Sequence, residues 1–238
     1  MNKKLYSALI LGFLATGLFA QEGVKFGIRV SPGINLAQIV NDSSKLKIDG
    51  LLTQAKMGIA TGLMLNFGFS ETAALHTGLH ILNRGYKSAT DVTDTADVVI
   101  ATLESNQSIM AVEIPLGIRL RSPEIGTGIF ITAFFGGAAE LNIKNKRVYD
   151  EFDTSTATID DLLQLETRDI KEVNLVTASF VVGAGVDWEF DWGTLVMGAS
   201  YHGGLMNILN KGHQEDLNLT TILNGKLSYI ALDLGYFF

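Results

Sequence analysis

The chain has 238 residues, of which 47% are hydrophobic and 18% are charged, and it contains no cysteine. This composition excludes an intrinsically disordered chain, a disulfide-stapled secreted scaffold and a cysteine-ligated zinc site. The net charge of −7 argues against a nucleic-acid partner, because nucleic-acid binding needs a basic surface.

The N-terminus has the pattern of a secretory signal peptide. Two lysines precede a continuous apolar stretch at residues 5–19, and the small residue Ala20 then precedes a polar pair. The apolar stretch is short for a membrane-spanning helix, so cleavage is favoured over an uncleaved anchor. We therefore expect residues 1–20 to be a cleaved signal peptide and residues 21–238 to form the mature domain.

Apolar and polar residues alternate with a period of two along most of the mature chain, which is typical of strands with two different faces. The clearest case covers residues 109–121. One face of this segment carries Met110, Val112, Ile114, Leu116, Ile118 and Leu120. The other face is charged or small and carries Ala111, Glu113, Pro115, Gly117, Arg119 and Arg121.

Eight segments of this kind are predicted as strands. They cover residues 24–31, 56–67, 72–86, 108–121, 127–140, 173–189, 194–206 and 226–238. Short turns and long polar links alternate between them. The turns lie near residues 68–71, 122–126 and 190–193, and the links near residues 32–55, 87–107, 141–172 and 207–225.

This layout predicts an all-β fold, an eight-stranded antiparallel up-and-down transmembrane β-barrel with short periplasmic turns and long extracellular loops. The barrel domain would occupy residues 21–238 and lie in the outer membrane of a Gram-negative bacterium, with lipid around its apolar face. The longest link contains an amphipathic pattern at residues 158–166 that predicts a short helix.

Charged residues of the predicted strands share the phase of the small and polar residues, so we expect them to face the lumen and to form ion pairs there. This lumen charge network comprises Arg29, Arg84, Glu113, Arg119, Glu140, Asp187, Glu189 and Asp233. Side chains can fill a barrel of eight strands, so a continuous aqueous pore is not expected.

Aromatic residues gather near the short turns and the C-terminus. Their rings favour the depth where lipid meets water, which predicts a girdle at the periplasmic interface. The predicted girdle comprises Phe67, Phe69, Trp188, Trp192, Tyr236 and Phe238.

Four segments carry a resemblance to a known family. They are VEIPLGIRL at residues 112–120, GIFITAFFGGAAELNI at 128–143, FVVGAGVDWEF at 180–190 and LDLGYFF at 232–238. In their order and spacing they resemble the PorT-like outer-membrane β-barrel family of Bacteroidota. The resemblance implies an outer-membrane barrel, a link to protein secretion, and recognition of the terminal Phe238 by the barrel-assembly machinery.

The polar face offers weak candidates for catalysis or metal binding. His76 and His80 are about 13 Å apart along one strand, which is too far to share a metal ion. Ser200, His202 and Asp233 share the inward phase of the last two strands, but Ser200 and His202 are about 7 Å apart along theirs. That separation is too long for a direct hydrogen bond unless the side chains bend together, so we expect no enzyme activity, no cofactor and no metal site.

Two functions of different classes remain open. The first is a non-enzymatic outer-membrane barrel with a structural, accessory or adhesive role, whose extracellular loops or periplasmic rim contact other envelope proteins. The second is a soluble periplasmic lipocalin-like barrel that binds an apolar ligand. The two differ in which face is apolar, because a soluble barrel is polar outside and apolar within.

Overall fold

A computed structural model describes residues 23–41, 52–93, 99–150, 172–210 and 223–238 of the chain. The expected signal peptide and the helical pattern at residues 158–166 lie outside these ranges. No helix in the described part of the chain has the length and apolar character needed to cross a membrane.

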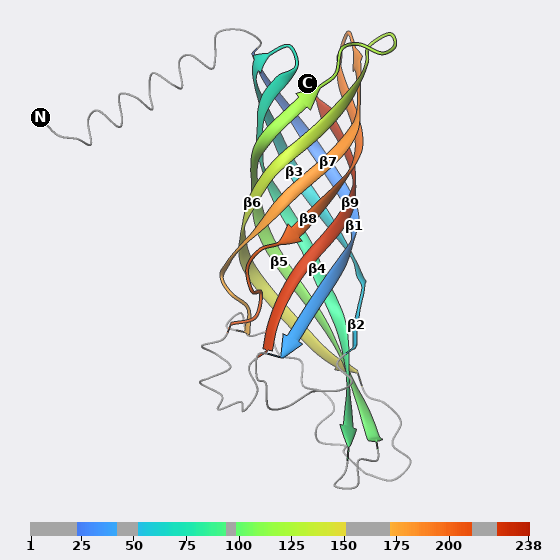
Figure 1. Ribbon diagram of the computed structural model, residues 1–238, viewed down its shortest axis with the longest axis vertical. Coiled ribbons are helices and arrows are strands. Elements are labelled where there is room, and N and C mark those ends of the chain that lie inside the picture. Colours follow the sequence, from blue (N-terminus) through green and yellow to red (C-terminus); the bar gives the residue numbers. More distant parts are fainter. Residues whose placement is uncertain (1–22, 42–51, 94–98, 151–171, 211–222) are drawn as a thin grey trace, which may run out of the picture.

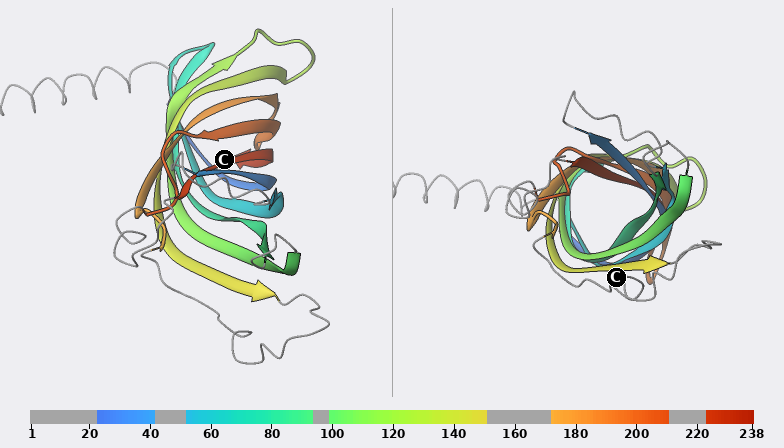
Figure 2. Two further views of the ribbon diagram at one scale, coloured as in Figure 1. Left: turned by 60° about the horizontal axis from the view of Figure 1, so that its bottom comes forward. Right: turned by 90° about the horizontal axis from the view of Figure 1, so that it is seen from below.

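The described residues form one antiparallel sheet that closes on itself (Figure 1; Figure 2). Its strands are β1 Val24–Asn41, β2 Leu52–Gln54, β3 Lys56–Ser70, β4 Ala73–Thr93, β5 Val99–Arg121, β6 Ile129–Asp150, β7 Val176–Phe190, β8 Gly193–Gly204 and β9 Leu223–Phe237. The three-residue β2 pairs with β4 beside the wall. The other eight strands pair with their neighbours in the chain, and β1 pairs with β9, which confirms the predicted up-and-down barrel.

The three short turns lie at the same end of the barrel as the start of β1 and the end of β9, at the top of Figure 1. In outer-membrane barrels this end faces the periplasm. The turn between β5 and β6 contains Gly128, whose φ of +69° suits a residue without a Cβ. The N–H of Gly128 donates to Glu124 Oε1 at 2.6 Å, which fixes the turn.

Side-chain exposure alternates along the strands in the predicted phase. On β5, Ile114, Leu116 and Leu120 are between 50% and 57% exposed, whereas Glu113 is fully buried. The exterior is therefore apolar and the interior polar, as lipid around the barrel requires. The alternative of a soluble lipocalin-like barrel with an apolar lumen is not favoured.

Four strands continue past their predicted ends on the loop side. β1 reaches Asn41 rather than residue 31, β4 reaches Thr93 rather than 86, β5 begins at Val99 rather than 108, and β6 reaches Asp150 rather than 140. Parts of the links predicted at residues 32–55, 87–107 and 141–172 are therefore strand. The apolar row stops where contact with lipid ends, but the backbone ladder continues wherever a neighbouring strand supplies partners. Lys87, for example, pairs with Asn106 on the loop side of the apolar row.

On the loop side, β7 and β8 are shorter than predicted and β9 is longer. β7 begins at Val176 rather than residue 173, β8 ends at Gly204 rather than 206, and β9 begins at Leu223 rather than 226. The chain before β7 and the chain after β8 leave the wall together and form an isolated bridge between Val173 and Leu209. Hydrophobic alternation could not show this departure, because an apolar residue such as Val173 or Leu209 suits either the lipid-facing wall or an apolar cluster inside the barrel.

A charge on the lipid-facing side of β5 should destabilise the barrel. Leu116→Arg is expected to lower the free energy of unfolding in lipid vesicles by about 2–4 kcal/mol, whereas Ile125→Arg in the exposed turn should lower it by about 0–1 kcal/mol. Urea titration followed by tryptophan fluorescence measures both. Equal losses in the two variants would mean that Leu116 does not face lipid.

Candidate functional site

At the periplasmic end of the lumen, one carboxylate bridges two cations. Glu189 on β7 accepts a hydrogen bond from Lys25 Nζ on β1 at 2.9 Å and another from Arg121 Nη2 on β5 at 2.5 Å. The Arg121 guanidinium also lies 3.3 Å from the centre of the Phe130 ring. The three charged side chains are 23–41% exposed, so water reaches this layer.

Two arginine–aspartate pairs follow farther inside. Arg119 on β5 donates to Asp187 on β7 at 2.5 Å, and Arg29 on β1 donates to Asp233 on β9 at 2.5 Å. The hydroxyl of Ser31 donates to the Asp233 carboxylate at 2.8 Å. These four charged side chains are 9–17% exposed, so the lumen becomes drier from the rim inward.

Glu113 on β5 is the next charge, and it contacts residues from three other strands. Tyr229 on β9 donates its hydroxyl to Oε2 at 2.6 Å, and His80 on β4 places Nδ1 3.0 Å from Oε1. His202 on β8 places Nδ1 3.3 Å from Oε2, and its ring stacks on Tyr229 at a centroid distance of 3.9 Å. Because β8 and β9 lie across the ring from β5, these contacts brace opposite walls.

Arg84 on β4 and Glu140 on β6 form the innermost ion pair, with Nη2 2.6 Å from Oε2. The Glu140 carboxylate also accepts hydrogen bonds from Thr177 at 2.7 Å and from Ser179 at 3.0 Å. Arg84 donates a further hydrogen bond to Asn142 Oδ1 at 3.1 Å. The Arg84 and Glu140 side chains are at most 2% exposed, so this pair lies out of contact with bulk water.

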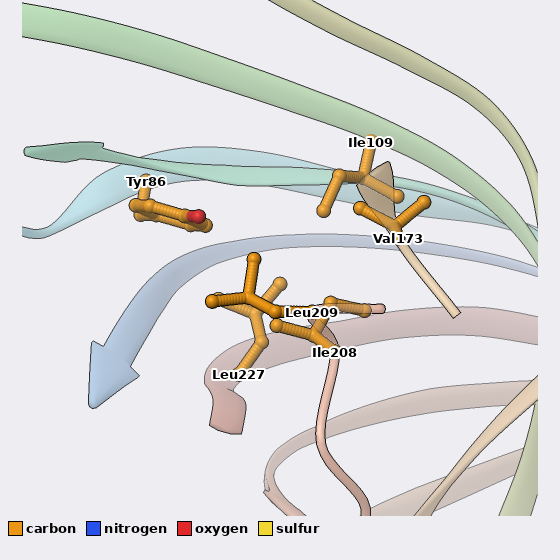
Figure 3. Close-up of a cluster of buried hydrophobic side chains, with 6 residues drawn as sticks. All are labelled: Tyr86, Ile109, Val173, Ile208, Leu209 and Leu227. Carbon is orange, nitrogen blue, oxygen red and sulfur yellow. The ribbon is translucent and has the colours of Figure 1, made fainter. Parts of the chain in front are cut away.

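Toward the extracellular side an apolar cluster closes the lumen (Figure 3). Three of its members come from strands β4, β5 and β9, and three come from the segments that leave the wall before β7 and after β8. The cluster, here called the outer plug, comprises Tyr86, Ile109, Val173, Ile208, Leu209 and Leu227, each at most 6% exposed. It lies on the extracellular side of the eight predicted lumen charges.

Two asparagines hold the inward-bending segments of the outer plug. Asn207 Oδ1 accepts hydrogen bonds from the N–H groups of Gly225 at 2.7 Å and Leu209 at 3.1 Å. Asn174 Nδ2 donates to the carbonyl oxygens of Asn207 at 2.7 Å and Leu209 at 3.1 Å. These side-chain amides replace ladder hydrogen bonds where β8 has ended.

The structure places the eight predicted lumen charges inside the barrel and gives each a polar partner. Sequence reasoning missed Tyr229 as a partner of Glu113, although it shares the inward phase of Asp233 on the same strand. It also missed the outer plug, since the sequence gives no sign of which loop residues turn inward.

The weak catalytic and metal candidates are arranged differently from the expectation. Ser200 Oγ lies 3.3 Å from His202 Nε2, because the two side chains lean toward each other, which is the exception that the spacing argument allowed. Asp233 pairs with Arg29 rather than completing that pair into a triad. His76 hydrogen bonds to Asn66 at 2.5 Å, and within the described ranges no group of His, Asp and Glu side chains is arranged to hold a metal ion.

Aromatic rings form a continuous series at the periplasmic end, running from β7 through the β7–β8 turn and β9 to β1. The centroid distances are 4.8 Å for Trp188–Phe190, 5.0 Å for Phe190–Trp192, 5.4 Å for Trp192–Tyr236, 5.0 Å for Tyr236–Phe238 and 6.0 Å for Phe26–Phe238. Phe67 and Phe69, also predicted for the girdle, lie near the periplasmic end of β3. The ring series is therefore concentrated on one side of the barrel.

Breaking the buried ion pair of Arg84 and Glu140 should lower the free energy of unfolding more than breaking the exposed pair of Lys25 and Glu189. Arg84→Ala leaves the Glu140 carboxylate buried without its cation and should lower the free energy of unfolding by about 3–5 kcal/mol. The double variant Arg84→Met/Glu140→Leu should regain most of this loss, because it removes both charges. Lys25→Ala at the exposed rim is the control and should cost less than about 1 kcal/mol in the same urea titration. A loss in Arg84→Ala no larger than the control would show that the inner pair does not stabilise the barrel.

Comparison with solved structures finds distantly similar proteins. No curated protein matches the chain in sequence. Among solved structures, the attachment invasion locus protein Ail of Yersinia pestis is 14% identical, with a TM-score of 0.37 over 90% of this chain and 99% of Ail. OprG of Pseudomonas aeruginosa is 12% identical, with a TM-score of 0.40 over 90% of this chain and 95% of OprG. Neisserial surface protein A is 10% identical, with a TM-score of 0.39 over 90% of this chain and 98% of its own.

The sequence model of one family covers most of the chain. This is the outer membrane protein beta-barrel domain, and the match extends over residues 19–210. The matched region includes the strands from β1 to β8. With its closed ring of strands, apolar exterior and paired internal charges, the chain belongs to the outer membrane protein beta-barrel domain family and resides in the outer membrane of a Gram-negative bacterium.

Proposed function

We propose that this protein is a non-enzymatic, non-conducting outer-membrane barrel with a structural, accessory or adhesive role exercised at its two rims. The observation that carries the proposal is the filled outer half of the lumen. Glu113, His80, Arg84 and Glu140 have side chains at most 2% exposed, and the outer plug lies beyond them. A solute has no open route past these layers, which leaves the rims as the surfaces available for function.

The outer rim supplies a raised surface for partners. β4, β5 and β6 extend farther on the loop side than the rest of the wall, and the β4–β5 hairpin projects below the barrel in Figure 1. Ladder pairing along this extension, such as Ser88 with Ser105, gives it a rigid frame. Rigid projections of this kind suit contacts with other envelope proteins or external surfaces.

The PorT-like resemblance refines the proposal. We infer a PorT-like protein of Bacteroidota, exported with a signal peptide at residues 1–20 and recognised by the barrel-assembly machinery through Phe238. The four segments that carry the resemblance fall on β5, β6, β7 and β9. This type of barrel implies an accessory role in protein secretion, with envelope proteins as its partners.

The filled lumen predicts an absence of conductance. The mature protein, inserted into a planar bilayer, should give no steady current steps under conditions in which a 16-stranded porin conducts. Insertion is verified by migration of the unheated protein as a compact band in a gel. Reproducible steps from the correctly inserted wild type would make transport the function and overturn the proposal.

The secretion link predicts a phenotype in the source bacterium. Deleting the chain should reduce the amount of secreted protein on the cell surface, and complementation with the wild type should restore it. Complementation with a variant in which residues 90–102 are replaced by a short turn tests whether the outer hairpin is the contact surface. Unchanged secretion in the deletion strain would remove the secretory role and leave the structural or adhesive ones.

A further inference from the structure

The periplasmic half of the lumen is hollow, in contrast to the filled outer half. One cavity of about 50 Å³ has a mostly apolar lining that also includes six polar residues, Arg29, His76, Arg119, Thr132, Ser200 and Asp233. A second cavity of about 60 Å³ lies nearer the periplasm and is lined by Lys25, Asn66, Glu71, Arg119, Arg121 and Asp187. Arg119 borders both cavities, and the pair of cavities is here called the vestibule.

The hollow exists because glycine occupies inward positions of the wall. Gly183 and Gly185 on β7 and Gly198 on β8 share the phase of the buried lumen residues and line the inner cavity. Arg119 on β5 borders the same cavity. The absence of side chains at these glycines therefore leaves less side-chain volume in this part of the lumen, beside the Arg119 guanidinium.

Water enters this vestibule from the periplasmic end. The second cavity, nearer the periplasm, is bordered by Gly23, Ser70 and Glu71, which lie beside the start of β1 and at the β3–β4 turn. Side-chain exposure falls from 41% at Lys25 to 12% at Arg119 and 1% at Arg84. The vestibule therefore lies toward the periplasmic end, and Glu113 borders neither cavity.

The vestibule has spare hydrogen-bond donors on two guanidinium groups whose charges are balanced by aspartates. Among the described residues, the hydrogen bonds of Arg119 to Thr132 and Asp187 both use Nη2, although a guanidinium carries five N–H donors. Arg29 likewise uses Nε and Nη2. The inner cavity is lined by these two guanidinium groups and by the hydroxyls of Thr132 and Ser200. Each guanidinium is paired with one aspartate, Arg119 with Asp187 and Arg29 with Asp233, and its remaining N–H groups can donate to a small oxyanion.

We propose that the vestibule is a binding site for a small oxyanion, a carboxylate or phosphate of a few heavy atoms, with Arg119 as its principal ligand. A cavity of 50 Å³ holds about three or four water molecules, which is the size of acetate or inorganic phosphate. The oxyanion accepts hydrogen bonds from the unused N–H groups of Arg119 and Arg29. The site is independent of the role proposed for the rims, because it faces the periplasm from inside the barrel.

The test is a titration of the refolded mature barrel in detergent micelles with acetate and, separately, with inorganic phosphate. Side-chain Nε–Hε resonances of the arginines and backbone amide resonances of Gly198 and Ser200 report on the cavity. We expect saturable shifts at these positions with at least one of the two anions, and none with chloride at equal ionic strength. Arg119→Gln should weaken binding about tenfold or more, because it removes charged hydrogen bonds. Arg147→Gln, at an arginine that borders neither cavity, is the matched control and should bind as the wild type does.

A second variant keeps the proposal falsifiable if Arg119→Gln fails to fold. Ser200→Leu fills the inner cavity from the β8 wall, leaves every arginine in place and should abolish the saturable shifts. Migration of the unheated protein in a gel verifies the fold of each variant. The proposal fails if the wild type shows no saturable shift with either anion, if chloride produces the same shifts, or if binding survives in folded Ser200→Leu.

Discussion

The pairing of buried charges across the lumen is the interaction on which the rest of the structure depends. A barrel surrounded by lipid must turn its ionisable side chains inward, where an unpaired charge costs several kcal/mol. Each carboxylate of the network has a cationic or hydrogen-bonding partner on another strand, as Asp187 has in Arg119 and Glu140 in Arg84. Because the partners lie on different strands, the same contacts that compensate the charges also tie the walls together.

The contacts change character along the lumen, and this change divides the molecule into two halves. At the periplasmic end the pairs are partly hydrated, and glycines on β7 and β8 leave a vestibule beside Arg119. Around Glu113 and beyond it, side chains fill the space and exclude water. The outer plug then closes the remaining end with apolar groups. Among the described residues, the two cavities therefore lie toward the periplasmic end, and the most tightly buried side chains lie toward the extracellular end.

The outer plug also shows how an irregular segment is accommodated beside a membrane. Backbone groups in a barrel wall must find partners, because lipid supplies none. Where β8 ends at Gly204, the side-chain amides of Asn174 and Asn207 take the place of a neighbouring strand. The apolar residues of this segment turn inward and join Tyr86 and Ile109, so a local break in the wall becomes the closure of the lumen.

The sequence by itself determined the number of strands in the barrel wall, the face of each that meets lipid and the end that carries the short turns, because a period of two and the cost of charge in lipid are local signals. It also placed Glu113 and Arg84 inside. It did not show the short β2, which pairs with β4 beside the wall. Only the tertiary structure decided the partners, such as Tyr229 for Glu113 across 116 residues of chain, since closure and register set which inward side chains meet. The tertiary structure likewise decided the ends of β4 and β6, the contact between Ser200 and His202, and the outer plug. Neighbouring strands and the orientations of the side chains fix these features, whereas hydrophobic alternation does not.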